Sequence, residues 1–234
     1  MAEAKTLVTF LLDRTGSMQA IKTDTMGAFN AYLETLKTSG APIEFSLVQF
    51  DSISIDKTCL NVAVADAPEL TDANYEPRAW TPLIDAAYKT IVAIADSLTK
   101  RDDKPSVVVC IQTDGEENAS KEHTWEELNA LIKEKTALGW QFNFMGASID
   151  AYKQGAQMGI ATADSLSYDS HDHVATQSAF RASASNTARF AAGLSASTNF
   201  SLSQKRASGD KYVPPVGSRP TPKSKQKIVD DITL

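Results

Sequence analysis

The sequence Leu7-Val-Thr-Phe-Leu-Leu-Asp-Arg-Thr-Gly-Ser17 joins a short apolar run to a polar loop that contains a glycine. An apolar run of this length that ends at a carboxylate is typical of a parallel strand buried on both faces. Apolar residues then recur at helical spacing from Ile21 to Leu36, and Gly40-Ala-Pro42 ends that helix. This part of the chain therefore predicts a strand, a polar loop and a helix.

Strand-like and helix-like segments continue to alternate as far as Leu194. The expected strands are 43–50, 53–64, 106–113, 140–146 and 166–168, and the expected helices are 82–98, 124–138, 149–158 and 173–194. Asp51-Ser52 suits a hairpin turn, so 53–64 is expected to be an antiparallel edge strand. The β-rich run 106–113 is expected to be central. The pattern predicts an α/β fold: a Rossmann-like, doubly wound, mostly parallel sheet with helices on both faces.

Two of these helices have recognisable starts. Pro82 is expected at the first helical position, where the missing N–H of proline costs nothing. Thr124-Trp-Glu-Glu127 has the spacing of a capping box, in which the first and last side chains each bind the other's backbone N–H. Both signals fix where a helix begins.

Charge is distributed unevenly along the chain of 234 residues. The formal net charge is −6; residues 205–234 hold seven Lys or Arg and three Asp, a net +4, so residues 1–204 carry −10. An acidic body repels nucleic acid, which argues against a DNA- or RNA-binding protein. Prolines cluster in 212–222. We therefore predict a domain over residues 1–202 and a basic, proline-containing tail over 203–234.

The sequence shows neither a targeting signal nor a cysteine pattern typical of a metal cluster or a disulfide framework. We see no apolar run of membrane-spanning length and no secretory signal, so we expect no membrane partner. Cys59 and Cys110 lie in strand-like runs without metal-cluster or disulfide spacing. We expect a cytoplasmic protein with reduced thiols, or one in the host cytoplasm or the virion if a phage encodes it.

Hard oxygen ligands follow the ends of the predicted strands. Asp13, Thr15 and Ser17 alternate directly after the first strand, Thr81 precedes the Pro82 helix, and Asp114 ends the central strand. Ligands of open α/β sheets bind beyond the carboxyl ends of the strands. Hydroxyls and carboxylates without Cys or His suit Mg²⁺ or Mn²⁺ and not zinc. Helix capping and a plain turn are the alternative roles of these residues.

The combined pattern resembles the von Willebrand factor A domain family, whose metal-ion-dependent adhesion site reads Asp-x-Ser-x-Ser, then Thr, then Asp. The resemblance covers roughly Thr6 to Leu194. Three passages are similar to small stand-alone members from bacteria and their phages: 11–18, 80–86 and 113–118. The chain departs from the family at Thr15, where Ser is usual, and at Arg78-Ala-Trp80, where many members have glycines. A bulkier rim is expected from the second departure.

The resemblance implies a role for each candidate ligand. Thr15 and Ser17 would supply hydroxyl ligands, Thr81 would bind directly or through water, and Asp13 and Asp114 would act mostly through waters. One coordination position would remain open for an Asp or Glu of a partner protein. Arg14 is expected either to contact that same carboxylate or to be solvated. In intracellular members of the family the partners are often AAA ATPases or components of stress and assembly systems, so the resemblance implies a partner of this kind.

Three function classes remain open at this point. A metal-dependent protein-binding module accounts for every candidate ligand and requires no catalysis. A virion or assembly component would use the tail for contacts between subunits. A Mg²⁺-dependent hydrolase is disfavoured because the sequence has no phosphate-binding Gly-rich loop, no nucleophile elbow and no His near the site. We therefore expect a binding protein and not an enzyme.

Overall fold

The structure is a computed structural model that describes residues 5–213. Its strands are β1 (Thr6–Asp13), β2 (Ile43–Phe50), β3 (Ile55–Ala63), β4 (Ser106–Thr113), β5 (Gln141–Ala147) and β6 (Ser165–Tyr168). Its α-helices are α1 (Lys22–Thr38), α2 (Leu83–Leu98), α3 (Trp125–Ala137), α4 (Ala151–Met158), α5 (His173–Ala191) and α6 (Leu202–Ala207). Short 3-10 helices span Gly16–Ile21, Val64–Asp66 and Thr162–Asp164.

The six strands form one sheet in the order β3-β2-β1-β4-β5-β6. Every neighbouring pair is parallel except β2 and β3, which pair antiparallel at the edge. The predicted fold class and the edge position of β3 are therefore confirmed. β1 and β4 lie at the centre, and the chain leaves their carboxyl ends towards opposite sides of the sheet.

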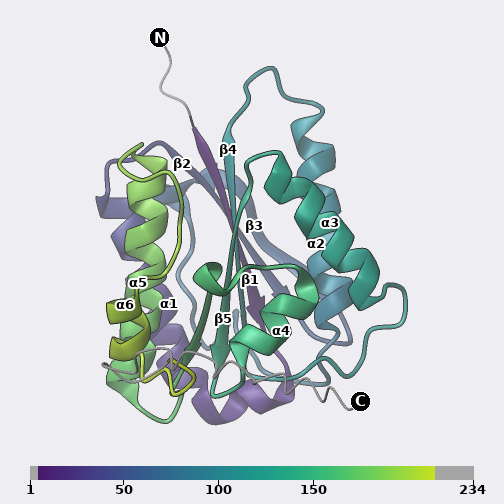
Figure 1. Ribbon diagram of the computed structural model, residues 1–234, viewed down its shortest axis with the longest axis vertical. Coiled ribbons are helices and arrows are strands. Elements are labelled where there is room, and N and C mark those ends of the chain that lie inside the picture. Colours follow the sequence, from purple (N-terminus) through teal and green to yellow (C-terminus); the bar gives the residue numbers. More distant parts are fainter. Residues whose placement is uncertain (1–4, 214–234) are drawn as a thin grey trace, which may run out of the picture.

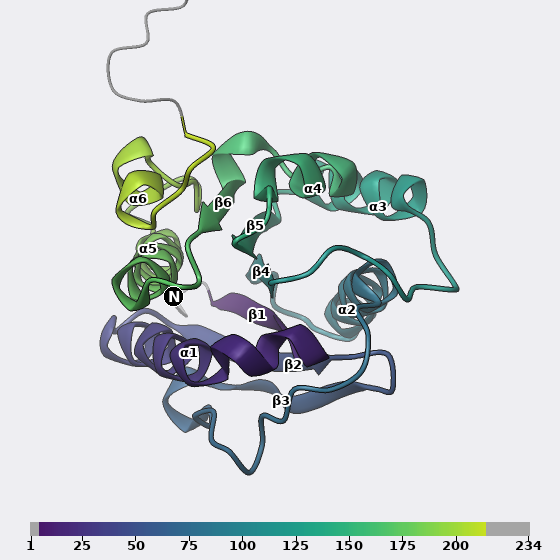
Figure 2. The ribbon, with the colours of Figure 1, turned by 90° about the horizontal axis from the view of Figure 1, so that it is seen from below.

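Helices cover both faces of the sheet (Figures 1 and 2): α1, α5 and α6 lie on one face, and α2, α3 and α4 on the other. The side chains of β1 contribute to the hydrophobic cores on both faces of the sheet, because successive side chains of a strand point to opposite faces. Phe10 packs in the first core, edge-on to Phe29 and Tyr32. Leu7 and Leu11 pack in the second core. This alternation explains why β1 reads as a nearly continuous apolar run.

The predicted capping box is present, whereas the predicted place of Pro82 was wrong by one position. Thr124 accepts the Glu127 N–H, and the Glu127 carboxylate accepts the Thr124 N–H. Pro82 is the N-cap residue of α2, and α2 begins at Leu83. A glutamate from another loop, Glu117, accepts the Ile84 N–H and satisfies this helix start.

The folded part of the chain continues past residue 202. Helix α6 crosses the boundary expected between residues 202 and 203, and Lys205, Ser208 and Asp210 are buried. The division into a domain and a tail stays a prediction, because residues 214–234 lie outside the described residues. No helix within residues 5–213 has the length and apolar character needed to cross a membrane.

Cys59 and Cys110 are free thiols on β3 and β4. Two strands, β2 and β1, separate them in the sheet. Adjacent strands are about 4.8 Å apart, so the two sulfur atoms are too distant to form a disulfide. Cys110 is buried in the core, whereas Cys59 is half-buried, and the expectation that both thiols are reduced agrees with this arrangement.

Candidate metal centre

The fold brings all five candidate ligands to one edge of the sheet. Asp13 is the last residue of β1, and Asp114 directly follows β4, the neighbouring strand. Thr15 and Ser17 lie in the loop and 3-10 turn after β1, and Thr81 lies just before α2. β1 and β4 meet where their connections diverge, which is the usual position of ligand sites in such sheets.

Hydrogen bonds link the five residues into one cluster. The Ser17 hydroxyl donates to Asp114 Oδ1 at 2.7 Å and lies 3.3 Å from the Thr15 hydroxyl. The Thr81 hydroxyl also donates to Thr15 Oγ1, at 3.3 Å. Asp13 Oδ1 accepts the Thr15 N–H at 2.6 Å. Three hydroxyls and two carboxylates from three loops therefore converge on one place.

Helix capping does not account for these hydroxyls. Thr15 is the N-cap residue of the 3-10 helix, but its side chain makes no capping hydrogen bond. Thr81 does not cap α2, whose N-cap residue is Pro82 and which has no side-chain cap at that position. The oxygen atoms of both threonines instead face the other members of the cluster. The alternative role considered from the sequence is therefore wrong for these two residues.

Burial controls the electrostatics of the two carboxylates. Asp13 is fully buried, and burial raises its pKa to about 7, although hydrogen bonds from Thr113 and Thr15 partly lower it. Burial also raises the pKa of Asp114, against the hydrogen bond from Ser17. Neither carboxylate has a cationic partner among the described ion pairs. A bound cation would supply the missing positive charge.

The donor set fits a hard divalent cation. All five side chains offer oxygen, the element that Mg²⁺ and Mn²⁺ prefer. Within residues 5–213 there is no group of three or more His, Cys, Asp or Glu side chains that could hold a metal ion, so the candidate centre depends on its hydroxyl groups as well as on its two carboxylates. Ser17 is exposed while Asp13, Thr15 and Thr81 are buried, so the cluster opens to solvent on the Ser17 side. The assignment of these residues as ligands stays a prediction.

We expect Mg²⁺ affinity to fall roughly tenfold for each pH unit below about 7, because a proton then competes for Asp13. The unfolding free energy of the metal-free protein should depend on pH in the opposite direction to the Mg²⁺ affinity. The folded-state pKa of Asp13, about 7, lies above its ordinary value of 3.8, so metal-free protein should lose stability as the pH rises between these values. Calorimetric titrations from about pH 5.5 to about pH 8.5 test the first effect. An affinity that does not vary over this range would contradict it.

Arg14 was expected to be solvated or to contact a partner's carboxylate, and the first expectation was wrong. Its guanidinium is buried and donates to Asp51 Oδ2 at 2.8 and 3.1 Å and to Asp56 at 2.7 Å. Arg78 donates to the same Asp51 oxygen at 3.0 Å. Asp51 thus ties the loop after β1 to the segment before Thr81. Through Asp51, Arg14 helps to position the two loops that carry Thr15 and Thr81.

The residues before Thr81 form a close backbone contact. The Gly16 N–H donates to the carbonyl of Ala79, and a Cβ on Gly16 would lie only 3.2 Å from that oxygen. Ala79 has a φ of 61°, the left-handed region that favours glycine. Trp80 next to it is 68% exposed. The bulkier rim expected from Arg78-Ala-Trp80 is therefore present beside the cluster.

Several residues that support the cluster were not singled out in the sequence. Thr113 donates to Asp13 Oδ2, the buried Tyr75 hydroxyl donates to the Asp13 carbonyl, and Asn118 Oδ1 accepts the Thr81 N–H. Glu117 accepts the Ile84, Ala119 and Ser120 N–H groups. Among these residues, only Thr113 could have been identified from the sequence, because it is next to Asp114 at the end of a predicted strand. The others come from distant loops.

A second pattern of potential metal ligands, His171-Asp-His173, lies on the surface. His173 Nδ1 lies 2.9 Å from Asp24, and His171 Nδ1 lies 3.7 Å from Asp169. Both histidine side chains are largely exposed. These are separate pairs, and neither gathers the further ligands that a zinc site needs.

Sequence comparison and structure comparison gave different results. No protein-family model matches the sequence, and no curated protein matches it. A von Willebrand factor type A protein from Catenulispora acidiphila matches in structure with a TM-score of 0.55 and 12% identity. That match covers 79% of this chain and 43% of the other.

Three further matched structures belong to two other proteins. Proximal thread matrix protein 1 of the mussel byssus has a TM-score of 0.57 and 13% identity, over 80% of this chain and 46% of that chain. Another structure of that protein, with a zinc-occupied MIDAS motif, has a TM-score of 0.50 and 16% identity, over 76% and 47%. The manganese-loaded TRAP protein of Plasmodium vivax has a TM-score of 0.54 and 15% identity, over 75% and 73%.

These likenesses concern the fold, because the identities are low. This chain spans less than half of the length of the first matched proteins. The fold expected from the strand-end pattern and the fold found by comparison are the same. The chain has the fold of a von Willebrand factor A domain.

Proposed function

We propose that this chain is a divalent-metal-dependent protein-binding module in which an acidic residue of a partner protein completes the coordination of a bound cation. The observation that carries the proposal is the convergence of three hydroxyls and two carboxylates at the ends of β1 and β4. When bound, Mg²⁺ or Mn²⁺ supplies an electrophilic position for an oxygen anion. Two proteins with this fold, the mussel and Plasmodium proteins, hold zinc and manganese, which supports the proposal.

The surface around the cluster supports a protein as the partner. Trp80 and Ile53 are each 68% exposed and line the same depression beside Thr81. The Trp80 N–H donates to Ser52 Oγ at 3.2 Å, which holds the two loops together. Exposed aromatic and aliphatic side chains beside a polar site are typical anchors of protein interfaces. The proposal extends to an AAA ATPase or assembly component as the class of partner.

Affinity capture in Mg²⁺ and in EDTA, with bound proteins identified by mass spectrometry, tests the proposal. The baits are the native chain, an Asp13→Ala variant and a Trp80→Ala variant. We expect a partner that the native chain retains only in Mg²⁺ and that Asp13→Ala loses. Trp80→Ala should bind Mg²⁺ normally but retain less partner, because Trp80 contacts the partner and not the cation.

Two outcomes would decide against the proposal. A partner retained equally in EDTA and by Asp13→Ala would show that the cation is not the bridge. Hydrolysis of p-nitrophenyl phosphate that required both Mg²⁺ and Asp13 would support the hydrolase alternative instead. Thermal unfolding of each variant in EDTA provides the folding control, because no variant can gain stability from metal there.

A further inference from the structure

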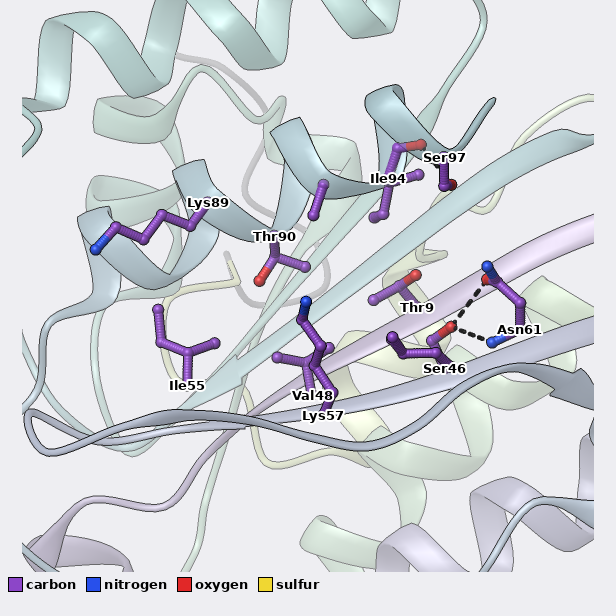
Figure 3. A pocket seen from close by; sticks show the side chains of 12 residues that line it. Thr9, Ser46, Val48, Ile55, Lys57, Asn61, Lys89, Thr90, Ile94 and Ser97 are labelled. Atoms are coloured by element: carbon purple, nitrogen blue, oxygen red, sulfur yellow. Dashed lines mark hydrogen bonds between the residues drawn. The ribbon is translucent and has the colours of Figure 1, made fainter. Parts of the chain in front are cut away.

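A cavity of about 320 Å³ lies between α2 and the β1-β2-β3 part of the sheet (Figure 3). None of the five candidate metal ligands lines it. Its volume falls at the lower end of the range for small-molecule sites, about 300–1,000 Å³. The cavity is therefore large enough for a small ligand and separate from the candidate metal centre.

The cavity exists because small polar side chains interrupt an apolar row. Thr9 and Ser46 are register partners on β1 and β2, and both are buried. Across from them, α2 presents Ala93 and Ser97. Their neighbours along the two strands belong to the apolar core: Leu7, Leu11, Val48 and Phe50. Four short side chains facing one another leave space that larger apolar residues would fill.

The Thr90 hydroxyl on α2 has no hydrogen-bond partner among the described residues. Thr90 is only 6% exposed, and it lines the cavity, where Figure 3 shows it facing the strands. A buried threonine in a helix ordinarily bonds to a carbonyl of the preceding turn, which this hydroxyl does not do. Seven buried side-chain oxygens within residues 5–213 lack a hydrogen-bond partner, and among them only Thr90 Oγ1 belongs to the lining of this cavity. Buried polar groups are nearly always paired, so this hydroxyl is the buried atom of the lining with which a polar ligand atom would pair.

A lysine without an ion pair supplies positive charge at the same cavity. Lys57 is an exposed residue of β3, so its ammonium lies at the solvent-facing side of the cavity; in Figure 3 its side chain extends from β3 towards α2, and no ion pair within residues 5–213 includes it. The second lysine of the lining, Lys89, is paired with Glu122 at 2.6 Å. One ammonium group therefore remains available to an anion. Both lysines disfavour a basic occupant such as the C-terminal residues of the chain.

We propose that this cavity binds a small anionic amphiphile, a monocarboxylate with a short apolar body. Its carboxylate would accept hydrogen bonds from the Lys57 ammonium and the Thr90 hydroxyl, both of which are otherwise unpaired. Its apolar body would pack against Val48, Ile55 and Ile94, which form the apolar walls. The proposal is independent of the metal-dependent function proposed above.

Calorimetric titration of the full chain with sodium octanoate, and with octan-1-ol as the neutral counterpart, tests the proposal. EDTA is present throughout, so that carboxylate binding to a metal does not contribute. We expect one octanoate per chain and an affinity for octan-1-ol that is lower by about tenfold or more, since charge-assisted hydrogen bonds are the stronger ones. Lys57→Gln should weaken octanoate binding about tenfold and leave octan-1-ol unchanged.

Matched variants make the outcome decisive. Thr90→Val keeps the shape but removes the hydroxyl, so it should weaken octanoate binding without lowering the melting temperature. Ala93→Phe should fill the cavity and abolish binding of both ligands, whereas Lys104→Gln, at an exposed lysine away from the cavity, should change nothing. Absence of octanoate binding by the native chain, or equal binding by Lys57→Gln, would overturn the proposal. These two results remain informative even if Ala93→Phe fails to fold.

Discussion

An Asp114→Ala variant is expected to bind Mg²⁺ about 100-fold more weakly than the native chain, a loss of about 2.7 kcal/mol. Asp114 supplies one of only two carboxylates in the candidate metal centre, and its Oδ1 also holds the Ser17 hydroxyl. The substitution therefore removes half of the negative charge and releases one hydroxyl ligand. Isothermal titration calorimetry at about pH 8 measures the affinity where proton competition at Asp13 is small.

Glu116→Ala is the matched control for this prediction. Glu116 is an exposed carboxylate two residues along the same loop, and no described hydrogen bond joins its side chain to the cluster. Its removal should change the affinity by no more than about threefold, since exposed charges are screened by salt and water. Equal losses in the two variants would mean that general acidity of the loop, and not coordination by Asp114, attracts the cation.

An Asp51→Ala variant is expected to lose about 3 kcal/mol of unfolding free energy, because it leaves the buried Arg14 guanidinium without its main partner. The Asp51 side chain is fully buried and accepts from Arg14, Arg78 and the Ile53 and Ser54 N–H groups. Chemical denaturation in EDTA measures the loss. The Mg²⁺ affinity should fall as well, since Asp51 joins the two loops that carry Thr15 and Thr81.

The same arrangement predicts a loss of stability in acid. Burial raises the pKa of Asp51, but the hydrogen bonds from Ile53, Ser54, Arg78 and Arg14 outweigh burial and hold it below the usual value. A lowered folded-state pKa adds stability above the unfolded value, and this stability is lost as the pH falls through the folded value.

Asp56→Ala is the control for the buried pair. Asp56 binds the same Arg14 guanidinium at 2.7 Å, but 47% of its side chain is exposed. Solvated ion pairs contribute about 1 kcal/mol or less, so this variant should be nearly as stable as the native chain. If Asp51→Ala proves equally mild, Arg14 does not depend on Asp51, and the positioning role assigned to this pair is wrong.

Much of the architecture followed from local pattern. The apolar run of β1, the hairpin turn before β3 and the capping box of α3 each depend on residues close together in sequence, and each was found as predicted. The misplaced start of α2 has a different cause. Pro82 is compatible with either the N-cap or the first helical position, and a distant side chain, Glu117, satisfies the helix start.

The sequence by itself determined which atoms gather at the candidate metal centre. Asp13, Thr15 and Ser17 are neighbours along the chain, and Asp114 follows the end of β4, the strand next to β1. Thr81 lies before α2, and contacts of its segment with the loop after β1 bring it to the cluster. Hydroxyl and carboxylate chemistry belongs to the residues themselves, so the preference for a hard cation could be stated without a structure.

Only the tertiary structure decided which polar groups are paired and which are free. Arg14 looks solvated in sequence, but its partner Asp51 lies 37 positions away on a neighbouring loop. Thr90 looks like an ordinary helical residue, yet short side chains on β1 and β2 leave its hydroxyl unpaired beside a cavity. Pairing and empty space depend on contacts between distant residues, which local sequence patterns do not encode.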